Sequence, residues 1–283
     1  MRPIALAATV GVATIALLSC GDSPDAARSP SVDGFDSHAA WRLLKRQVAL
    51  GPRPAGSPRS RRLGRRLRRL LPDGHFQSVP GGLRNVVGEV PGRSRRYVVV
   101  GAHYDTKDIP GFVGANDGAS GTAVVTQLAR GITPRRLPKT LVFVLFDGEE
   151  SPAGVPDSEF EQKGLRGSKV AARRFRRARA MVLLDFVGDK RLRLPREANS
   201  NWSLWHRLRT AAGRVGVAGT FPPIATGPVL DDHGPFIERG VPAIDLIDFD
   251  FPCFHRACDD LDAVSERSLD RVGETMVRYL ASL

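Results

Sequence analysis

Acidic and histidine side chains follow three of the apolar runs in this sequence of 283 residues. The runs cover residues 97–102, 141–146 and 181–184, and the side chains after them are His103, Asp105, Glu149, Glu150 and Asp185. Adjoining loops supply Asp117, Asp231, Asp232 and His255. Carboxylates that are packed together repel one another unless a cation neutralises them. These residue types therefore predict a metal site.

The apolar runs are β-prone and stop abruptly, which is typical of buried strands. Further strands are expected at 85–90 and 243–247, and helices at 37–49, 59–71, 120–130, 167–179, 203–212 and 268–280. Strands that alternate with helices predict an α/β fold: a mixed, mostly parallel central sheet flanked by helices on both faces, in a single domain. Ligands bind such sheets at the carboxyl edge of the strands. Pro91 and Gly92 predict a hairpin between strands 85–90 and 97–102.

The first 20 residues predict a targeting segment. Arg2 precedes the apolar run 4–18, which is too short for a membrane-spanning helix and is followed by Cys20. This order resembles a bacterial lipoprotein signal over residues 1–20, in which Cys20 would carry lipid. An ordinary cleaved signal peptide with a chance cysteine is the alternative. Residues 21–34 would then be a flexible tether before a folded domain at 35–283.

From the targeting segment we expect an exported protein that is lipid-anchored to a bacterial membrane and faces outside the cytoplasm. Cys253 and Cys258 remain as two further cysteines, and they flank His255. An oxidising setting favours a disulfide that would close a small loop around the histidine. Zinc thiolates are the alternative, but no second pair of cysteines completes a four-cysteine site.

Arginine-rich runs at 59–69 and 173–179 supply much of the formal net charge of +12. Contact with nucleic acid or an anionic membrane is one interpretation. No interleaved aromatic residues and no nucleic-acid motif accompany the arginines, so we expect solvated helix faces and no nucleic-acid partner. Attraction to anionic lipid would suit an anchored protein.

Six segments together resemble the metal-site motifs of the M28 zinc peptidase family, and they follow that family's order. They are His103-Tyr-Asp105, residues 114–121, Asp147-Gly-Glu-Glu150, Gly167-Ser168, Leu184-Asp185 and Phe254-His255. The resemblance covers residues 35–283 and implies the fold of the zinc aminopeptidases, which is phosphorylase/hydrolase-like. Residues 51–58 and 231–236 are similar to the animal-type glutaminyl cyclase branch. Members of that branch, the glutaminyl-peptide cyclotransferases, convert an N-terminal glutamine into pyroglutamate.

The resemblance implies a metal role for three matched residues and a catalytic role for a fourth. Asp117, Glu150 and His255 would bind one zinc ion (Zn²⁺) and leave a coordination position open, as in catalytic sites. By the same resemblance, Glu149 would be the general acid and base. Its place beside Glu150 is consistent with this role, because neighbouring side chains on an extended or turning segment diverge, one toward metal and one toward substrate.

The implied reaction joins two groups of one residue. Zinc would polarise the γ-carboxamide of an N-terminal glutamine, and Glu149 would move a proton from the α-amine to the departing ammonia. Asp185 and Asp231 would form a hydrogen-bonding network that holds Glu149 and the tetrahedral intermediate. The partners would be peptide or protein N-termini, and a monomer is expected.

His103 and Asp185 leave a second interpretation open. In the two-zinc aminopeptidases of the family they would join as ligands of a second metal, with Asp117 bridging, and Glu149 would activate water to cleave the first peptide bond. The loop around Asp117 lacks the extra acid that is common in those enzymes. Segment 231–233 also supplies a carboxylate where peptidases often have an uncharged residue. One zinc and cyclisation are therefore favoured over two zincs and hydrolysis.

Two departures affect the pocket that would hold the glutamine side chain. Phe254 stands where an animal cyclase usually has tryptophan, and Phe160 is the only aromatic residue in 151–164. Nearby acids are interpreted as parts of a solvated loop, with a pocket entrance as the alternative: Asp245, Asp248 and Asp250. A non-catalytic binding lipoprotein would need a broken ligand set, whereas every proposed ligand here is a competent one.

Overall fold

A six-stranded sheet crosses the computed structural model, which describes Met1 and residues 34–283. Its strands are β1 (His75–Val79), β2 (Leu83–Val90), β3 (Ser94–His103), β4 (Lys139–Phe146), β5 (Met181–Asp185) and β6 (Ala243–Ile247). The spatial order is β1-β2-β4-β3-β5-β6. Strands β4, β3, β5 and β6 run parallel to one another, whereas β2 pairs antiparallel with β4 and β1 pairs antiparallel with β2 at one edge. The predicted mixed, mostly parallel sheet is confirmed.

The hairpin predicted at Pro91 and Gly92 is wrong, because β4 lies between β2 and β3. Strand β3 is buried on both faces from Val98 to His103, so it needs a hydrogen-bonded neighbour on each edge. Strand β4, which is apolar from Leu141 to Phe146, meets that need on one side, and β5 on the other. Arg93 donates its backbone N–H to the carbonyl of Leu137, so the 91–93 turn binds the start of β4 instead of closing a hairpin.

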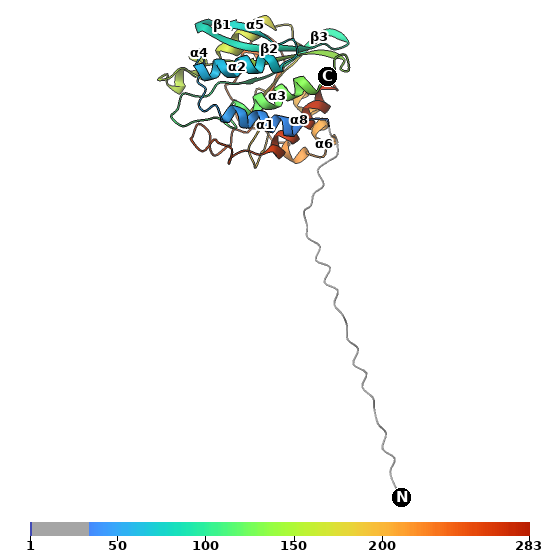
Figure 1. Ribbon diagram of the computed structural model, residues 1–283. Coiled ribbons are helices and arrows are strands. Elements are labelled where there is room, and N and C mark those ends of the chain that lie inside the picture. Colours follow the sequence, from blue (N-terminus) through green and yellow to red (C-terminus); the bar gives the residue numbers. More distant parts are fainter. Residues whose placement is uncertain (2–33) are drawn as a thin grey trace. The chain divides into compact units, whose positions relative to one another are not determined.

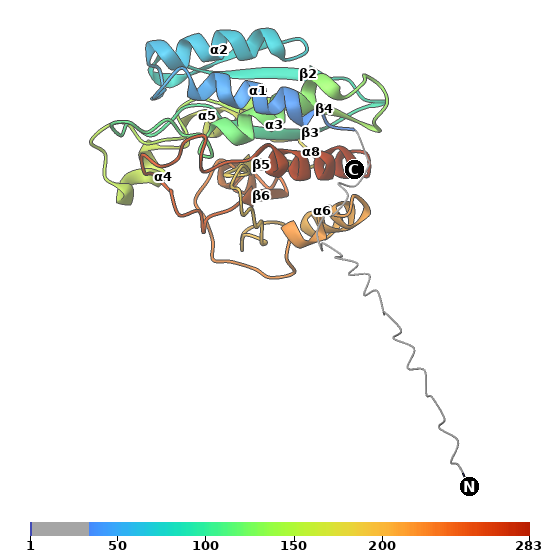
Figure 2. The ribbon, with the colours of Figure 1, turned by 60° about the horizontal axis from the view of Figure 1, so that its bottom comes forward.

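Two layers of helices cover the two faces of the sheet (Figure 1). Alternate strand residues belong to different apolar clusters: Val98 and Val100 of β3 join one, and Val99 joins the other. The larger cluster includes residues of α1 (Ser37–Val48), α2 (Pro58–Leu70), α3 (Ala119–Gly131), α6 (Trp202–Arg214) and α8 (Glu266–Leu280). The smaller cluster is covered by α5 (Arg166–Arg174) and α7 (Gly234–Ile237). Figure 2 shows the sheet from β2, near α2, to β6, near α6.

Local sequence explains where the helices begin. Ser57 caps α2 by accepting the N–H of Ser60, and Pro58 occupies the first turn, where its missing N–H costs nothing. Leu63 and Leu67 are buried beneath the helix. The arginines of α2 point to solvent, as expected for a solvated helix face.

Residues 34–283 belong to one compact unit, so the predicted single domain is confirmed for the part that the structure describes. The predicted signal and nearly all of the tether lie outside the described residues. None of the described helices is long and apolar enough to cross a bilayer. Short helices complete the chain: α4 (Phe160–Lys163) and 3₁₀ turns at Pro80–Gly82, Asp157–Glu159 and Ala218–Thr220.

Candidate active site

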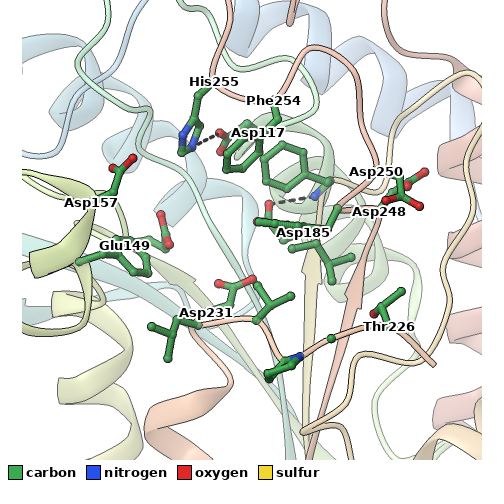
Figure 3. A pocket seen from close by; sticks show the side chains of 18 of the residues that line it. Asp117, Glu149, Asp157, Asp185, Thr226, Asp231, Asp248, Asp250, Phe254 and His255 are labelled. Carbon is green, nitrogen blue, oxygen red and sulfur yellow. Dashed lines mark hydrogen bonds and ion pairs between the residues drawn. The ribbon is translucent and has the colours of Figure 1, made fainter.

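The carboxyl ends of β3, β4 and β5 meet at one edge of the sheet, and the predicted site residues gather there. A cavity of about 560 Å³ opens at this edge. Its walls include all six residues predicted for one zinc and its acid–base network: Asp117, Glu149, Glu150, Asp185, Asp231 and His255. Figure 3 labels all of them except Glu150. Five of these side chains are buried, and His255 is 21% exposed. The shared sheet edge thus brings together residues that are far apart in the sequence.

Asp117, Glu150 and His255 converge on one point. His255 Nε2 lies 3.4 Å from Asp117 Oδ2 and 3.4 Å from Glu150 Oε1. These two carboxylate oxygens are buried and accept no hydrogen bond from any residue that the structure describes. Buried oxygens of this kind normally have a partner. Two oxygens and one imidazole nitrogen fit a zinc ion with an open coordination position.

The electrostatics of the three residues also fit a cation. Burial and the charge of Asp117 raise the pKa of Glu150, although His255 opposes the shift. Burial alone would lower the pKa of His255, but Asp117 and Glu150 raise it to about 9. Burial would likewise raise the pKa of Asp117, but the neighbouring imidazoles of His103 and His255 lower it. The site therefore favours positive charge among its carboxylates.

A second group of potential ligands lies beside the first. His103 Nε2 is 3.1 Å from Asp117 Oδ1 and 3.2 Å from Asp185 Oδ1. Asp117 thus offers one oxygen to each group, and both groups have the spacing of metal ligands. The geometry is compatible with a second metal ion, in which case Asp117 would bridge the pair.

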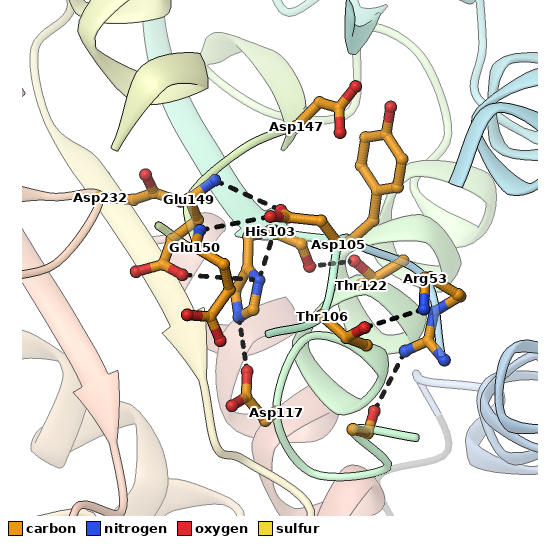
Figure 4. Close-up of polar contacts among 12 residues, drawn as sticks. Arg53, His103, Asp105, Thr106, Asp117, Thr122, Asp147, Glu149, Glu150 and Asp232 are labelled. Atoms are coloured by element: carbon orange, nitrogen blue, oxygen red, sulfur yellow. Dashed lines mark hydrogen bonds and ion pairs between the residues drawn. The ribbon is translucent and has the colours of Figure 1, made fainter. Parts of the chain in front are cut away.

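Asp105 connects this second group to the paired glutamates (Figure 4). Its Oδ1 lies 3.7 Å from Nδ1 of His103, as expected for a carboxylate that orients the ring. It also accepts the backbone N–H groups of Glu149 at 3.3 Å and Glu150 at 3.2 Å. One fully buried carboxylate therefore fixes both the histidine and the turn after β4.

Glu149 and Asp231 are two acids of the cavity wall whose pKa values are raised and which belong to neither group of potential metal ligands. Burial, followed by the charge of Glu150, raises the pKa of Glu149 well above its ordinary value. Burial, followed by the charge of Asp185, raises the pKa of Asp231 to about 7. A general acid and base needs a pKa near the working pH, and burial supplies that shift.

The sequence suggests His233 as a structural hydrogen-bond partner within the site loop, whereas it does not reveal Glu197. His233 is fully buried between Glu197 Oε2 at 3.3 Å and Asp245 Oδ2 at 3.7 Å. The solvated-loop interpretation of Asp245 is wrong, because it lies inside the buried strand β6. That strand was expected at 243–247, so its apolar flanks were the available signal. Glu197 lies in an irregular segment, and no pattern marked it.

The cavity has aromatic side chains in its wall, although the sequence departs from the cyclase pattern at Phe254 and in residues 151–164. Phe254 stacks on the imidazole of His255, with ring centres 3.9 Å apart and planes inclined by 24°. Phe160, Phe186 and Phe249 also line the cavity. Two more acids line it as well, Asp248 and Asp250, so the pocket-entrance interpretation of this pair holds.

Cys253 and Cys258 form the disulfide that the sequence favoured, and His255 lies within the closed loop.

Comparison with known proteins identifies the family of this chain. Residues 85–280 match peptidase family M28. The chain belongs to this family.

Two M28 relatives are glutaminyl cyclases by name. The glutaminyl-peptide cyclotransferase-like protein of Bos taurus is 28% identical, over 86% of this chain and 74% of that protein. The crystal structure of an Acidobacteriales bacterium glutaminyl cyclase is 30% identical, with a TM-score of 0.75 over 91% of this chain and 97% of that one. A zinc-dependent exopeptidase from Parabacteroides distasonis shares the fold, with a TM-score of 0.77, 24% identity and coverage of 88% and 99%. The resemblance to the cyclase branch of M28, and the interpretation as an enzyme, are confirmed.

Proposed function

We propose that this M28 protein is a zinc-dependent glutaminyl-peptide cyclotransferase that converts the N-terminal glutamine of peptides to pyroglutamate and releases ammonia. One observation carries the proposal: Glu149 lies in the cavity wall directly beside an open triad of ligand atoms. The names of its M28 relatives support cyclisation as the use of that arrangement.

Glu149 performs both proton transfers of the reaction. It accepts a proton from the substrate's α-amine, whose nitrogen attacks the carbonyl carbon of the γ-carboxamide of the same residue, and it then donates that proton to the amide nitrogen that departs as ammonia. Zinc held by Asp117, Glu150 and His255 would supply a Lewis acid for the γ-carboxamide oxygen. Amine and amide belong to one residue, so positioning lowers the barrier and no water needs activation.

Asp185 and Asp231 support Glu149 from the cavity wall. Burial and its carboxylate neighbours raise the pKa of Asp231 to about 7, so near neutrality a share of this group carries a proton that it can donate in a hydrogen bond. Asp185 accepts the backbone N–H of Phe186 at 2.9 Å, which fixes its side chain at the end of β5. These two acids hold Glu149 and the tetrahedral intermediate.

A Gln-initiated peptide tests the reaction by mass spectrometry. The expected product is the peptide minus one ammonia, and it should be absent after chelator treatment and in the Glu149→Gln variant. Free glutamine with a peptide shortened by one residue would instead identify an aminopeptidase. An intact peptide in the wild type, with a panel of other N-terminal residues also unreacted, would refute both activities.

The aminopeptidase alternative has one specific observation in its favour, the His103–Asp117–Asp185 group. We propose one zinc for the cyclase, in the group that contains His255. Metal analysis of protein loaded at equilibrium should give one zinc per chain, and His103→Ala should leave that zinc bound. Two zincs per chain, with one lost in His103→Ala, would favour the two-metal hydrolase.

We further propose that residues 1–20 are a lipoprotein signal, that Cys20 carries lipid, and that the catalytic domain at 35–283 faces outside the cytoplasm on a tether, as a monomer. The disulfide at Cys253–Cys258 supports an oxidising location. Cys20→Ser should move the protein from the membrane fraction to the soluble fraction of the expressing bacterium. An unchanged membrane fraction would contradict the lipid anchor, and a dimer in light scattering would contradict the monomer.

A further inference from the structure

The loop at 253–259 contains one proposed zinc ligand, His255, and it also contacts the segment that carries a second one, Asp117. His255 belongs to the loop itself, and the disulfide Cys253–Cys258 closes it on both sides of this histidine. Arg256, Ala257 and Cys258 are exposed to solvent. Little packing therefore restrains the outer side of the loop, and the disulfide is its covalent restraint.

Asp259, directly after the closed loop, binds the segment that carries Asp117. Its two carboxylate oxygens accept the backbone N–H groups of Asn116 at 2.7 Å and Asp117 at 3.0 Å. Its backbone carbonyl accepts the N–H of Ala115 at 3.2 Å. Asp259 is fully buried, so these three hydrogen bonds are sheltered from water.

The backbone of His255 is strained in a way that requires such restraint. Its φ of 50° lies in the left-handed region, which residues with a Cβ seldom adopt. Its ring is held from one side by Phe254, with centres 3.9 Å apart, and edge-on by Phe112 at 6.1 Å. A loop free to relax would leave this conformation and move Nε2 away from Asp117.

We infer that the Cys253–Cys258 bond and Asp259 act together as a staple that sets the position of His255 relative to Asp117 for zinc. The two cysteines and Asp259 are positioning residues, since their side chains act through the backbone of the ligand loops. The inference rests on the zinc ligands of the proposed function, but it does not depend on which reaction follows.

The test measures the zinc dissociation constant of the Cys253→Ser/Cys258→Ser variant by competition with a chromogenic chelator. Outer partners of metal ligands typically contribute about 10- to 100-fold to affinity, so we expect a loss of at least about tenfold. Leu208→Ala, in the buried face of α6, is the control for lowered stability and should keep the wild-type dissociation constant. A serine variant within about twofold of wild type would overturn the inference.

A His255→Ala background separates positioning from general weakening. If the staple acts through His255, the serine pair should cause no further loss of zinc affinity in a chain that already lacks this imidazole. The same fold-loss in both backgrounds would overturn the inference. Asp259→Asn keeps the disulfide, so it tests the other half of the staple even if the serine pair fails to fold. Its zinc affinity should also fall, and an unchanged value would again refute the staple.

These measurements use zinc alone and no substrate. Weakened zinc binding in a protein that never cyclises glutamine would leave the staple standing and refute the proposed reaction. Normal zinc binding in a serine variant that cyclises glutamine at the wild-type rate would refute the staple and leave the proposed reaction standing.

Discussion

Glu149 differs from its neighbour Glu150 in what surrounds its carboxylate, although both backbone N–H groups bind the same Asp105. Glu150 points to Nε2 of His255, whereas Glu149 belongs to no group of converging ligand atoms in the described chain. The same short turn thus carries one proposed zinc ligand and, beside it, the carboxylate that we propose as the acid and base.

Replacing Glu149 by glutamine should separate these two functions. Glutamine keeps the size of the side chain but cannot accept a proton, so kcat for cyclisation should fall by about 10²- to 10⁴-fold. Zinc content should stay at the wild-type value because Asp117, Glu150 and His255 are untouched. Metal analysis and initial rates on the same preparation provide the check, and a variant with more than a tenth of wild-type kcat would rule out the acid–base role.

Asp248, at the cavity entrance, should make the folded state less stable as pH rises. Burial, followed by the charges of Asp189 and Asp250, raises its pKa from 3.8 to about 6 even though it accepts the N–H of Arg193. The proton therefore stabilises the fold: the contribution is complete below pH 3.8, the unfolded value, and is lost as pH rises through about 6.

Asp248→Asn removes this dependence while keeping an oxygen for Arg193. The variant should be more stable than wild type by about 1 to 3 kcal/mol above pH 6, and the difference should vanish near pH 3.8. Urea unfolding curves across this range measure the effect. A variant that is less stable at neutral pH would show that the charged carboxylate is stabilising.

At the scale of elements, α3 lies unusually close to the sheet at Gly121. A Cβ there would meet the carbonyl oxygen of Leu184 in β5 at 2.0 Å and Ala102 of β3 at 3.1 Å. Helix α3 follows directly on the loop that carries Asp117, so its distance from the sheet also affects how deeply that side chain lies in the site.

Gly121→Ala should push α3 outward and destabilise the protein by about 1 to 3 kcal/mol, as overpacking does. Gly131→Ala, in the same helix but with no atom within 4 Å of the added Cβ, is the matched control and should be neutral or slightly stabilising. Denaturant unfolding compares the two. Equal effects would mean that the close contact with Leu184 is relieved without cost.

The elements, and the acids and histidines that gather at the candidate site, were largely predictable, whereas contacts between residues distant in sequence were not. Strands β3, β4 and β5 follow from apolar runs, and the acids at their ends mark the site because charge at the end of a buried strand is a local signal. The position of β4 between β2 and β3 was not predictable in this way. It depends on the burial of both faces of β3, and the turn between β2 and β3 gives no sign of it. Asp259 is similar: its partners Asn116 and Asp117 lie more than a hundred residues away, and sequence alone gives no register for such a contact.

At the scale of the whole molecule, arginine charge is concentrated on α2. The exposed arginines of this helix form no ion pair with any described residue: Arg59, Arg61, Arg62, Arg65, Arg66, Arg68 and Arg69. Helix α5 and the turn after it carry a comparable group on the opposite face of the sheet, at 173–177. Substitutions in the arginines of α2 can therefore be compared with matched substitutions in the arginines at 173–177.

If α2 helps an anchored protein lie on an anionic membrane, Arg62→Glu/Arg65→Glu/Arg69→Glu should weaken binding of residues 34–283 to phosphatidylglycerol vesicles at least about tenfold at low salt. The control Arg173→Glu/Arg176→Glu/Arg177→Glu should bind as wild type does. Co-sedimentation measures both. Equal losses would indicate attraction by net charge alone, and no binding by wild type would leave α2 as a solvated face.

The third proposed zinc ligand, His255, follows all six strands in the sequence. A chain cut short after β6 would keep every strand of the sheet and the pair Asp117 and Glu150, yet it would lack the imidazole and the loop that aligns it. Catalysis by this protein therefore requires a chain that has been translated almost as far as its last helix. Proteolytic loss of the C-terminal segment would silence the enzyme while much of its sheet sequence persisted.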